Sequence, residues 1–110
     1  MEKYQVIFYE HANGDCPVED FLSSVDAKLS AKAYRLLELV SEYGADLREP
    51  YSKHLSDGIF KLRIDVATNA IRLLYFFIDK RCVVLTNGFV KKRPKTPVGE
   101  ITRAKAYRKD

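Results

Sequence analysis

In the stretch Ile59-Phe-Lys-Leu-Arg-Ile-Asp65, apolar and charged side chains alternate from Phe60 onward. An extended chain points successive side chains to opposite faces, so a period of two indicates a β-strand. Phe60, Leu62 and Ile64 share one face, and Lys61, Arg63 and Asp65 share the other. Because the apolar face must be covered, the strand is expected to belong to a sheet that packs against helices.

Two more strands are expected downstream. Residues 71–79 are mostly apolar, and residues 82–89 form a further run rich in β-branched and aromatic side chains. The connections at 67–70 and 79–81 are short, which favours an antiparallel meander over residues 55–89 with the helices on one face. Upstream, residues 4–10 have the composition of a first strand.

The clearest helix runs from about Asp26 to Tyr43, because its apolar residues recur every three or four positions. Asp26 is a suitable N-cap, and Gly44 can adopt the left-handed conformation that ends a helix. A short helix is expected at 18–23 and a last one after Thr96, which would act as its N-cap. The expected fold is a single α+β domain over residues 1–110, with N-terminal helices on a small antiparallel sheet and a C-terminal helix.

Composition narrows the class of protein. Hydrophobic residues make up 46% and charged residues 31% of the 110 residues, which is typical of a soluble globular chain. No run of about 18 apolar residues is present, so no contact with a membrane interior is expected. Residues 1–4 lead directly into the first strand without the apolar stretch of a signal peptide, which predicts a cytoplasmic protein. Cys16 and Cys82 are then expected to be free thiols.

Neither a metal nor a cofactor is predicted. His11 and His54 are far apart in the sequence, and neither has a second ligand at helical spacing. The glycines do not form a phosphate-binding loop. Two isolated cysteines do not make a metal site either.

Positive charge is concentrated in one part of the chain. Residues 89–110 hold eight basic and two acidic side chains, a net charge of +6, whereas residues 1–88 carry −2. A local basic excess points to a phosphate-bearing partner or an acidic protein surface.

The strands are expected to bring distant cations together. Lys61 and Arg63 share a face, Arg72 begins the next strand, and Lys91 and Lys92 end the third. In a meander these five side chains could converge on one concave face. The alternative is that Arg63 or Arg72 forms a surface ion pair with Asp65 or Asp79.

Such a cluster suits RNA cleavage, because RNA carries its own nucleophile in the 2′-hydroxyl. The reaction needs a base for the 2′ proton, cations for the developing negative charge and an acid for the leaving 5′ oxygen. Arg63 and Arg72 suit charge stabilisation. The candidates for base and acid are Lys61, Lys91 and Lys92, which lie among other cations, and His54, whose imidazole is the commonest acid–base group in enzymes.

Further residues are candidates for RNA binding. Arg93 and Lys95 belong to the basic segment, and Lys53 precedes His54. Tyr75 could stack on a base, although its apolar neighbours favour core packing instead.

Four segments of the sequence, taken together, resemble those of a known protein family. They are Leu55-Ser-Asp-Gly-Ile-Phe-Lys-Leu-Arg63, Ile71-Arg-Leu-Leu-Tyr-Phe-Phe77, Val83-Val-Leu-Thr-Asn-Gly-Phe89 and Lys91-Lys-Arg-Pro-Lys-Thr-Pro-Val-Gly-Glu-Ile101. Together they resemble the phage-derived branch of the RelE/ParE toxin superfamily, to which HigB toxins belong.

The resemblance implies a RelE-like fold and ribosome-dependent cleavage of mRNA, with neutralisation by a helix-turn-helix antitoxin similar to HigA. The toxin–antitoxin complex, rather than the toxin alone, would bind operator DNA. The family's strand arginines map onto Arg63 and Arg72, and its basic cluster maps onto Lys91 and Lys92. One departure is that some relatives use a C-terminal His or Tyr for proton transfer, whereas this chain has no His there and only Tyr107 on the last helix.

Two other functions remain open. ParE relatives poison DNA gyrase without cutting RNA, and a plain nucleic-acid-binding module would use its cations only to hold phosphates. The gyrase poison would not need Arg63, Arg72 and Lys91 on one face. Sequence also leaves open whether the antitoxin covers the basic groove or restrains the toxin elsewhere.

Overall fold

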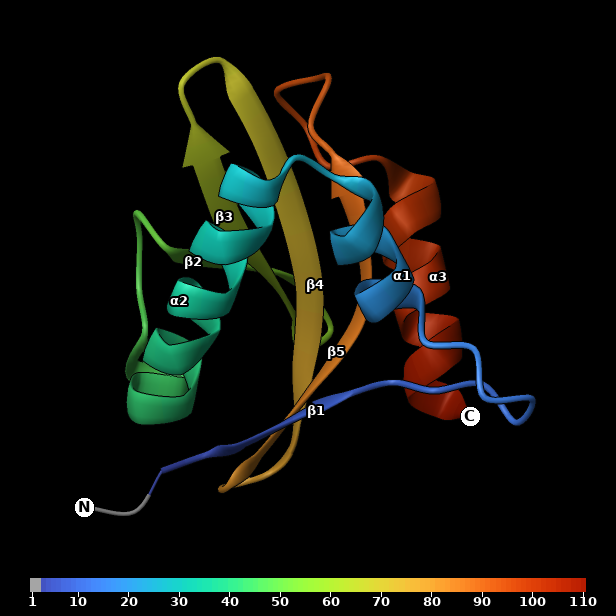
Figure 1. Cartoon of the computed structure of the whole chain (residues 1–110). Helices are drawn as coiled ribbons and strands as arrows, with labels where there is room; N and C mark the ends of the chain where they lie inside the picture. Colours follow the sequence, from blue (N-terminus) through green and yellow to red (C-terminus); the bar gives the residue numbers. More distant parts are fainter. Residues whose placement is uncertain (1–2) are drawn as a thin grey trace.

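A computed structural model describes residues 3–110 of the chain and shows an α+β arrangement (Figure 1). Within these residues three helices, one helical turn and five strands follow in the order β1 (Gln5–Phe8), α1 (Pro17–Ser24), α2 (Ala27–Tyr43), η1 (Gly44–Asp46), β2 (Ser52–Ser56), β3 (Ile59–Val66), β4 (Asn69–Asp79), β5 (Cys82–Val90) and α3 (Val98–Lys109). The expected α+β class is confirmed.

The sheet is mixed, so the expectation of an antiparallel sheet is only partly right. Its strand order is β1-β5-β4-β3-β2, and β2 to β5 form the expected antiparallel meander. β1 pairs with β5 in parallel, with Gln5 opposite Cys82 and Phe8 opposite Leu85. Local sequence pattern predicts a strand but not its partner, and here the partner lies more than 70 residues away.

β2 is an edge strand that the sequence pattern does not predict. Lys53 lies opposite Lys61, and His54 lies opposite Phe60. An edge strand is only partly covered, so its sequence, Ser-Lys-His-Leu-Ser, shows no apolar alternation from which it could be recognised.

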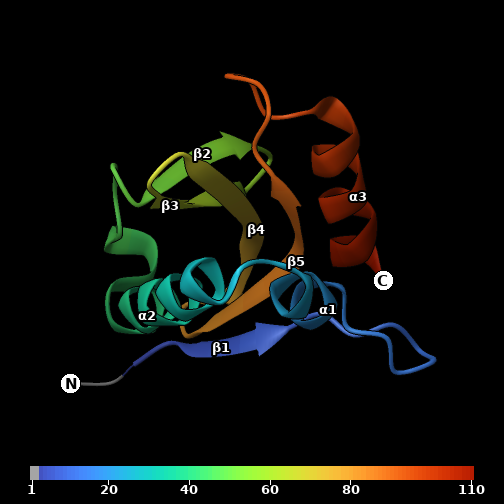
Figure 2. The ribbon, with the colours of Figure 1, turned by 45° about the horizontal axis from the view of Figure 1, so that its top comes forward.

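The main core lies between the sheet and the two N-terminal helices, which run along one face (Figure 2). The Asp26 side chain caps α2 by accepting a hydrogen bond of 2.7 Å from the backbone N–H of Lys28. Gly44 ends the helix with a φ of 50°, and a Cβ there would overlap the ring of Tyr4. Both predicted ends of this helix are therefore confirmed. The buried apolar residues of α2 are those expected, namely Leu29, Ala33, Leu36, Leu37 and Val40.

α3 packs on the opposite face, so the expectation that the helices share one face is wrong. Ala104 is fully buried in a second cluster with Ile59, Leu74 and Phe89. The helix begins at Val98 with Pro97 as its N-cap residue, and Thr96 does not cap it as predicted. Pro97 keeps an extended backbone, with a ψ of 134°, and the helical conformation begins only after it.

The cysteines Cys16 and Cys82 are free, as expected. Over residues 3–110, no helix has both the length and the hydropathy needed to cross a bilayer.

Candidate functional site

The basic residues of the central strands meet on the face that α3 packs against. Pairing of β3 with β4 places Arg63 directly opposite Arg72, and pairing of β2 with β3 places Lys53 opposite Lys61. Lys91 follows β5, and its backbone N–H donates a 2.9 Å hydrogen bond to the carbonyl of Ala70 at the start of β4. Residues far apart in the sequence are therefore neighbours at one end of the sheet.

Lys61 lies at the centre of this group. Its side chain is buried, and burial lowers its pKa from the ordinary value of 10.5. The positive charges of Arg63, Arg72, Lys53 and Lys91 lower the pKa further, in that order. The cations therefore share one electrostatic environment, as the strand pattern predicted.

A cleft opens beside Lys61, and we call it the basic cleft. Its cavity volume is about 10 Å³, room for roughly one water molecule, so the basic cleft is a shallow hollow. The segment between β5 and α3 forms much of its wall. Its lining residues are Lys61, Arg72, Phe89, Lys91, Lys92, Arg93, Pro94, Lys95, Thr96 and Pro97. Six of these ten carry a positive charge, so the cleft has a positive potential that favours anions.

Arg72 is the most constrained of these cations and is 4% exposed. Its Nη1 donates to the Asp65 carboxylate at 2.8 Å and to the backbone carbonyl of Ile71 at 2.9 Å. Its Nε is buried and has no hydrogen-bond partner within residues 3–110. The ion pair with Asp65, considered above as an alternative, is therefore present together with the cluster. A buried donor without a partner is costly, so this Nε–H is a candidate contact for a ligand that displaces the atoms covering it.

Arg63 is half-buried and forms no ion pair with any residue in the described part of the chain. Asp79, the other candidate partner, accepts a hydrogen bond of 2.7 Å from the backbone N–H of Arg81. Asp65 is therefore the one acid that pairs with this group, and a phosphate would relieve the repulsion that remains.

His54 does not join the basic cleft. It shares the helix-covered face of the sheet with Phe60, and the two rings lie 5.1 Å apart. Its Nε2 accepts the backbone N–H of Gly58 at 3.1 Å within the β2–β3 hairpin. The structure thus leaves the predicted base or acid on the opposite face from Lys61.

Tyr75 also faces away from the basic cleft and is 1% exposed. Its ring packs between Phe60 and Phe77, its hydroxyl bonds to that of Ser52, and its burial raises its pKa. It cannot stack on a base, and its alternative assignment to the core is correct.

The remaining candidates lie at the surface. Lys92, Arg93 and Lys95 line the basic cleft, while Lys53 is exposed on the edge strand beside Lys61. Their roles in RNA binding stay predictions. No group of three or more His, Cys, Asp or Glu residues suited to a metal ion occurs within residues 3–110.

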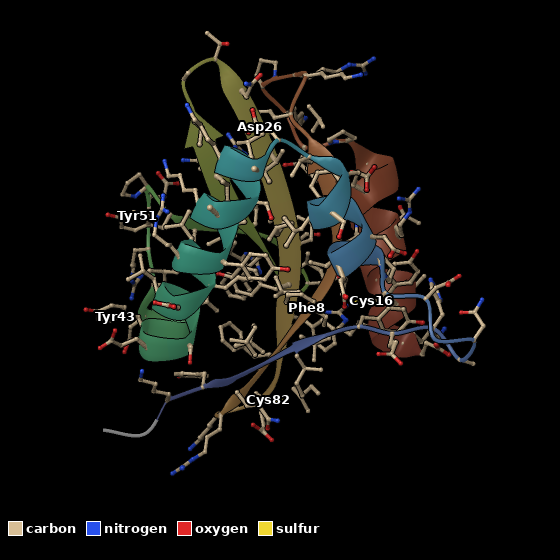
Figure 3. The ribbon with its side chains drawn as sticks, in the orientation of Figure 1. Phe8, Cys16, Asp26, Tyr43, Tyr51 and Cys82 are labelled. Atoms are coloured by element: carbon tan, nitrogen blue, oxygen red, sulfur yellow. The ribbon has the colours of Figure 1, made fainter. Side chains whose placement is uncertain are left out.

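Tyr107 lies near the C-terminal end of α3, whereas the residues before the N-terminus of that helix line the basic cleft. It stacks on Tyr9 with ring centres 4.6 Å apart and meets the edge of His11 at 5.0 Å. A hydrogen bond from the Tyr9 hydroxyl to the Asp110 carboxylate raises the pKa of Tyr9 to about 12. These contacts join the segment between β1 and α1 to the end of α3. Phe8 and Cys16, which flank that segment, are labelled in Figure 3.

The sequence reasoning missed the contacts that anchor α3 beside the basic cleft. The Asn87 amide donates to the Glu100 carboxylate at 3.0 Å and to its backbone carbonyl at 3.3 Å. Thr86 supports Asn87 through a hydrogen bond of 2.6 Å between their side chains. The sequence feature that could have indicated these contacts is the polar pair Thr86-Asn87 inside an otherwise apolar strand. Buried polar side chains need hydrogen-bond partners, so this pair predicts a polar contact with another element.

The fold and the cleft define a small α+β domain with a basic anion site at one end of its sheet. Residues 20–109 match the family model described as "Phage derived protein Gp49-like (DUF891)". The chain therefore belongs to the Gp49-like family, a RelE-like type of toxin from toxin–antitoxin systems. No match was found among curated proteins.

Proposed function

We propose that this protein is the HigB-like toxin of a type II toxin–antitoxin system and that it cleaves mRNA on the ribosome. One observation carries the proposal. Cations from two strands, Lys61 on β3 and Arg72 on β4, and from the segment after β5 line one cleft, and its buried Arg72 has an Nε–H without a partner. A single phosphodiester would satisfy that donor and relieve the crowding of like charges.

The proposed reaction is attack of the RNA 2′-hydroxyl on the adjacent phosphorus, which forms the new O–P bond and breaks the bond to the 5′ oxygen. Arg63 and Arg72 would stabilise the extra negative charge on the phosphate oxygens. Lys61 would take the 2′ proton, because its lowered pKa leaves more of its amine neutral than in an ordinary lysine. Lys91 or Lys92 would protonate the leaving oxygen.

The surrounding cations would hold the rest of the RNA. Lys92, Arg93 and Lys95 line the cleft wall, and Lys53 extends the positive surface along the sheet edge. Contacts of this kind bind the phosphate backbone without reading bases and weaken with added salt. In this proposal the ribosome presents the mRNA, which would supply the selectivity that the cleft lacks.

A helix-turn-helix antitoxin similar to HigA is the proposed partner in the cytoplasm, and operator DNA would be bound only by the toxin–antitoxin complex. The family assignment supports a toxin paired with an antitoxin. A gyrase poison would have no need for the convergence of Arg63, Arg72 and Lys61, so this geometry favours the nuclease over the gyrase poison.

The test is survival after induction of an Arg63→Ala, Arg72→Ala double variant. The proposal predicts that cells survive while the variant still sediments with ribosomes. Arg63→Ala alone is a second variant, because Arg63 is half-buried without an ion pair within residues 3–110 and its loss should leave the fold intact. Arg35→Ala removes the same charge from an exposed position on α2 and should remain toxic. A double variant as toxic as the parent would rule out the assigned roles.

A further inference from the structure

Asp65 stands out because it is an acid inside a cluster of cations. Its carboxylate, which is 56% exposed, holds the guanidinium of Arg72, which is 5% exposed. A simple counter-charge would be expected to compete with an incoming phosphate. The atoms involved point to another role.

The Asp65 carboxylate and the backbone carbonyl of Ile71 both accept hydrogen bonds from Nη1 of Arg72. The Nε of the same guanidinium has no partner and is buried. In a guanidinium, Nε–H and the neighbouring Nη2–H form a fork on the edge away from Nη1, and this fork matches two oxygens of a phosphate. The two bonds at Nη1 therefore fix the plane of the group without occupying that edge.

Asp65 is itself held in place. The Lys32 ammonium, from α2, donates to the backbone carbonyl of Asp65. The β3–β4 ladder continues beyond it, pairing Asp65 with Ala70 and Val66 with Asn69 across a turn in which Ala67 has a φ of 53°. An acceptor fixed from two sides can orient its donor more sharply than a free surface carboxylate can.

We propose that Asp65 is a positioning residue that holds Arg72 with its Nε edge directed to a phosphodiester in the basic cleft. The inference rests on the proposed function for the identity of the ligand. The alternative is that Asp65 is only a counter-charge. The two views predict opposite changes in RNA affinity when Asp65 is replaced by Ala.

Removal of Asp65 has opposite consequences in the two views. If Asp65 only neutralises charge, Asp65→Ala and Asp65→Asn both make the cleft more positive and both tighten RNA binding. If Asp65 positions Arg72, Asp65→Ala releases the guanidinium and weakens binding. Asp65→Asn keeps an oxygen acceptor for Nη1 and preserves binding.

The first measurement is the affinity for a short single-stranded RNA whose 2′-oxygens are methylated, so that it cannot be cleaved. We expect Asp65→Ala to raise the Kd by about tenfold, the order expected for loss of one charge-assisted hydrogen bond, and Asp65→Asn to stay within about twofold of the parent. Asp57→Asn is the matched control, because Asp57 pairs with Lys105 at 3.1 Å on the β2–β3 turn. Tighter binding by Asp65→Ala would overturn the proposal.

The second measurement is the ¹⁵N NMR signal of the Arg72 Nε–H, which reports orientation whether or not RNA is bound. The signal should persist in Asp65→Asn, be lost or broadened in Asp65→Ala, and shift in the parent when inorganic phosphate is added. An unchanged signal in a folded Asp65→Ala variant would refute the positioning role. A parent that holds this signal but binds no RNA would instead refute the proposed function and leave the positioning role standing.

Discussion

Replacement of Lys61 by Met should stabilise the fold. Lys61 is buried among cations, and its lowered pKa shows that the folded state disfavours its charge. Met has a similar length and no charge, so Lys61→Met keeps the packing and removes the repulsion. A residue that weakens the fold in this way is better explained by function than by structure.

The magnitude follows from strand geometry. Lys53 lies opposite Lys61, and Arg63 lies two residues along on the same face, which places their Cβ atoms at about 5 and 7 Å. If the charged groups stay about as far apart as their Cβ atoms, they repel by about 0.8 and 0.6 kcal/mol even at the dielectric constant of water. Arg72 and Lys91 add repulsion, and Asp65 offsets part of it. The free energy of unfolding should therefore rise by about 1 kcal/mol, or about 4–8 °C in Tm.

The assay is thermal unfolding of parent and Lys61→Met at several pH values and salt concentrations. The unfolded chain binds more protons than the folded one between the lowered pKa of Lys61 and 10.5, so the parent regains stability as pH rises through that window. The gain from Lys61→Met should therefore be full at neutral pH and shrink toward pH 10 and in high salt. Lys80→Met, at an exposed turn, should leave Tm nearly unchanged. A Tm below that of the parent for Lys61→Met would refute this reasoning.

Three further predictions concern the core and the pH dependence. Gly44→Ala should lower the free energy of unfolding by about 2 kcal/mol in a denaturant titration, because its positive φ and the ring of Tyr4 leave no room for a methyl group; an unchanged midpoint would contradict the assigned helix end. Tyr75→Phe should cost about 1 kcal/mol, because the buried Ser52 hydroxyl loses its partner, yet RNA binding should not change since Tyr75 faces away from the cleft. If Lys61 is the base, only its neutral amine is active, so the cleavage rate should rise with pH up to its lowered pKa and then level off; a rate that falls over that range would exclude this role.

Much of the fold could be predicted because its strongest signals are local. The alternation around Lys61 and the spacing of Leu29, Ala33 and Leu36 each follow from one element that buries one face. The cap residues Asp26 and Gly44 act within one turn of their helix. Such features need no knowledge of the rest of the chain.

The errors concern contacts between distant segments. The parallel pairing of β1 with β5 and the position of α3 on the second face depend on the whole topology. β2 could not be predicted from the sequence, because an edge strand does not need an apolar face and its residues show no alternation.

The candidate site was predicted in part for the same reason. Alternation placed Lys61 and Arg63 on one face, and the meander brought Arg72 beside them. Sequence placed His54 near the same site, but a one-residue step along an extended strand turns a side chain to the opposite face, and His54 and Lys53 are consecutive. In Arg72, Nη1 is hydrogen-bonded and Nε has no partner within residues 3–110. This difference depends on atomic positions that no sequence pattern encodes.

The central claim is that the basic cleft holds the phosphodiester that is broken. Its most direct test is primer extension on a translated mRNA after induction of the parent and of Arg63→Ala in parallel. The proposal predicts cuts within translated codons for the parent and none for Arg63→Ala at equal protein levels. Growth arrest by the parent with the mRNA intact would contradict it.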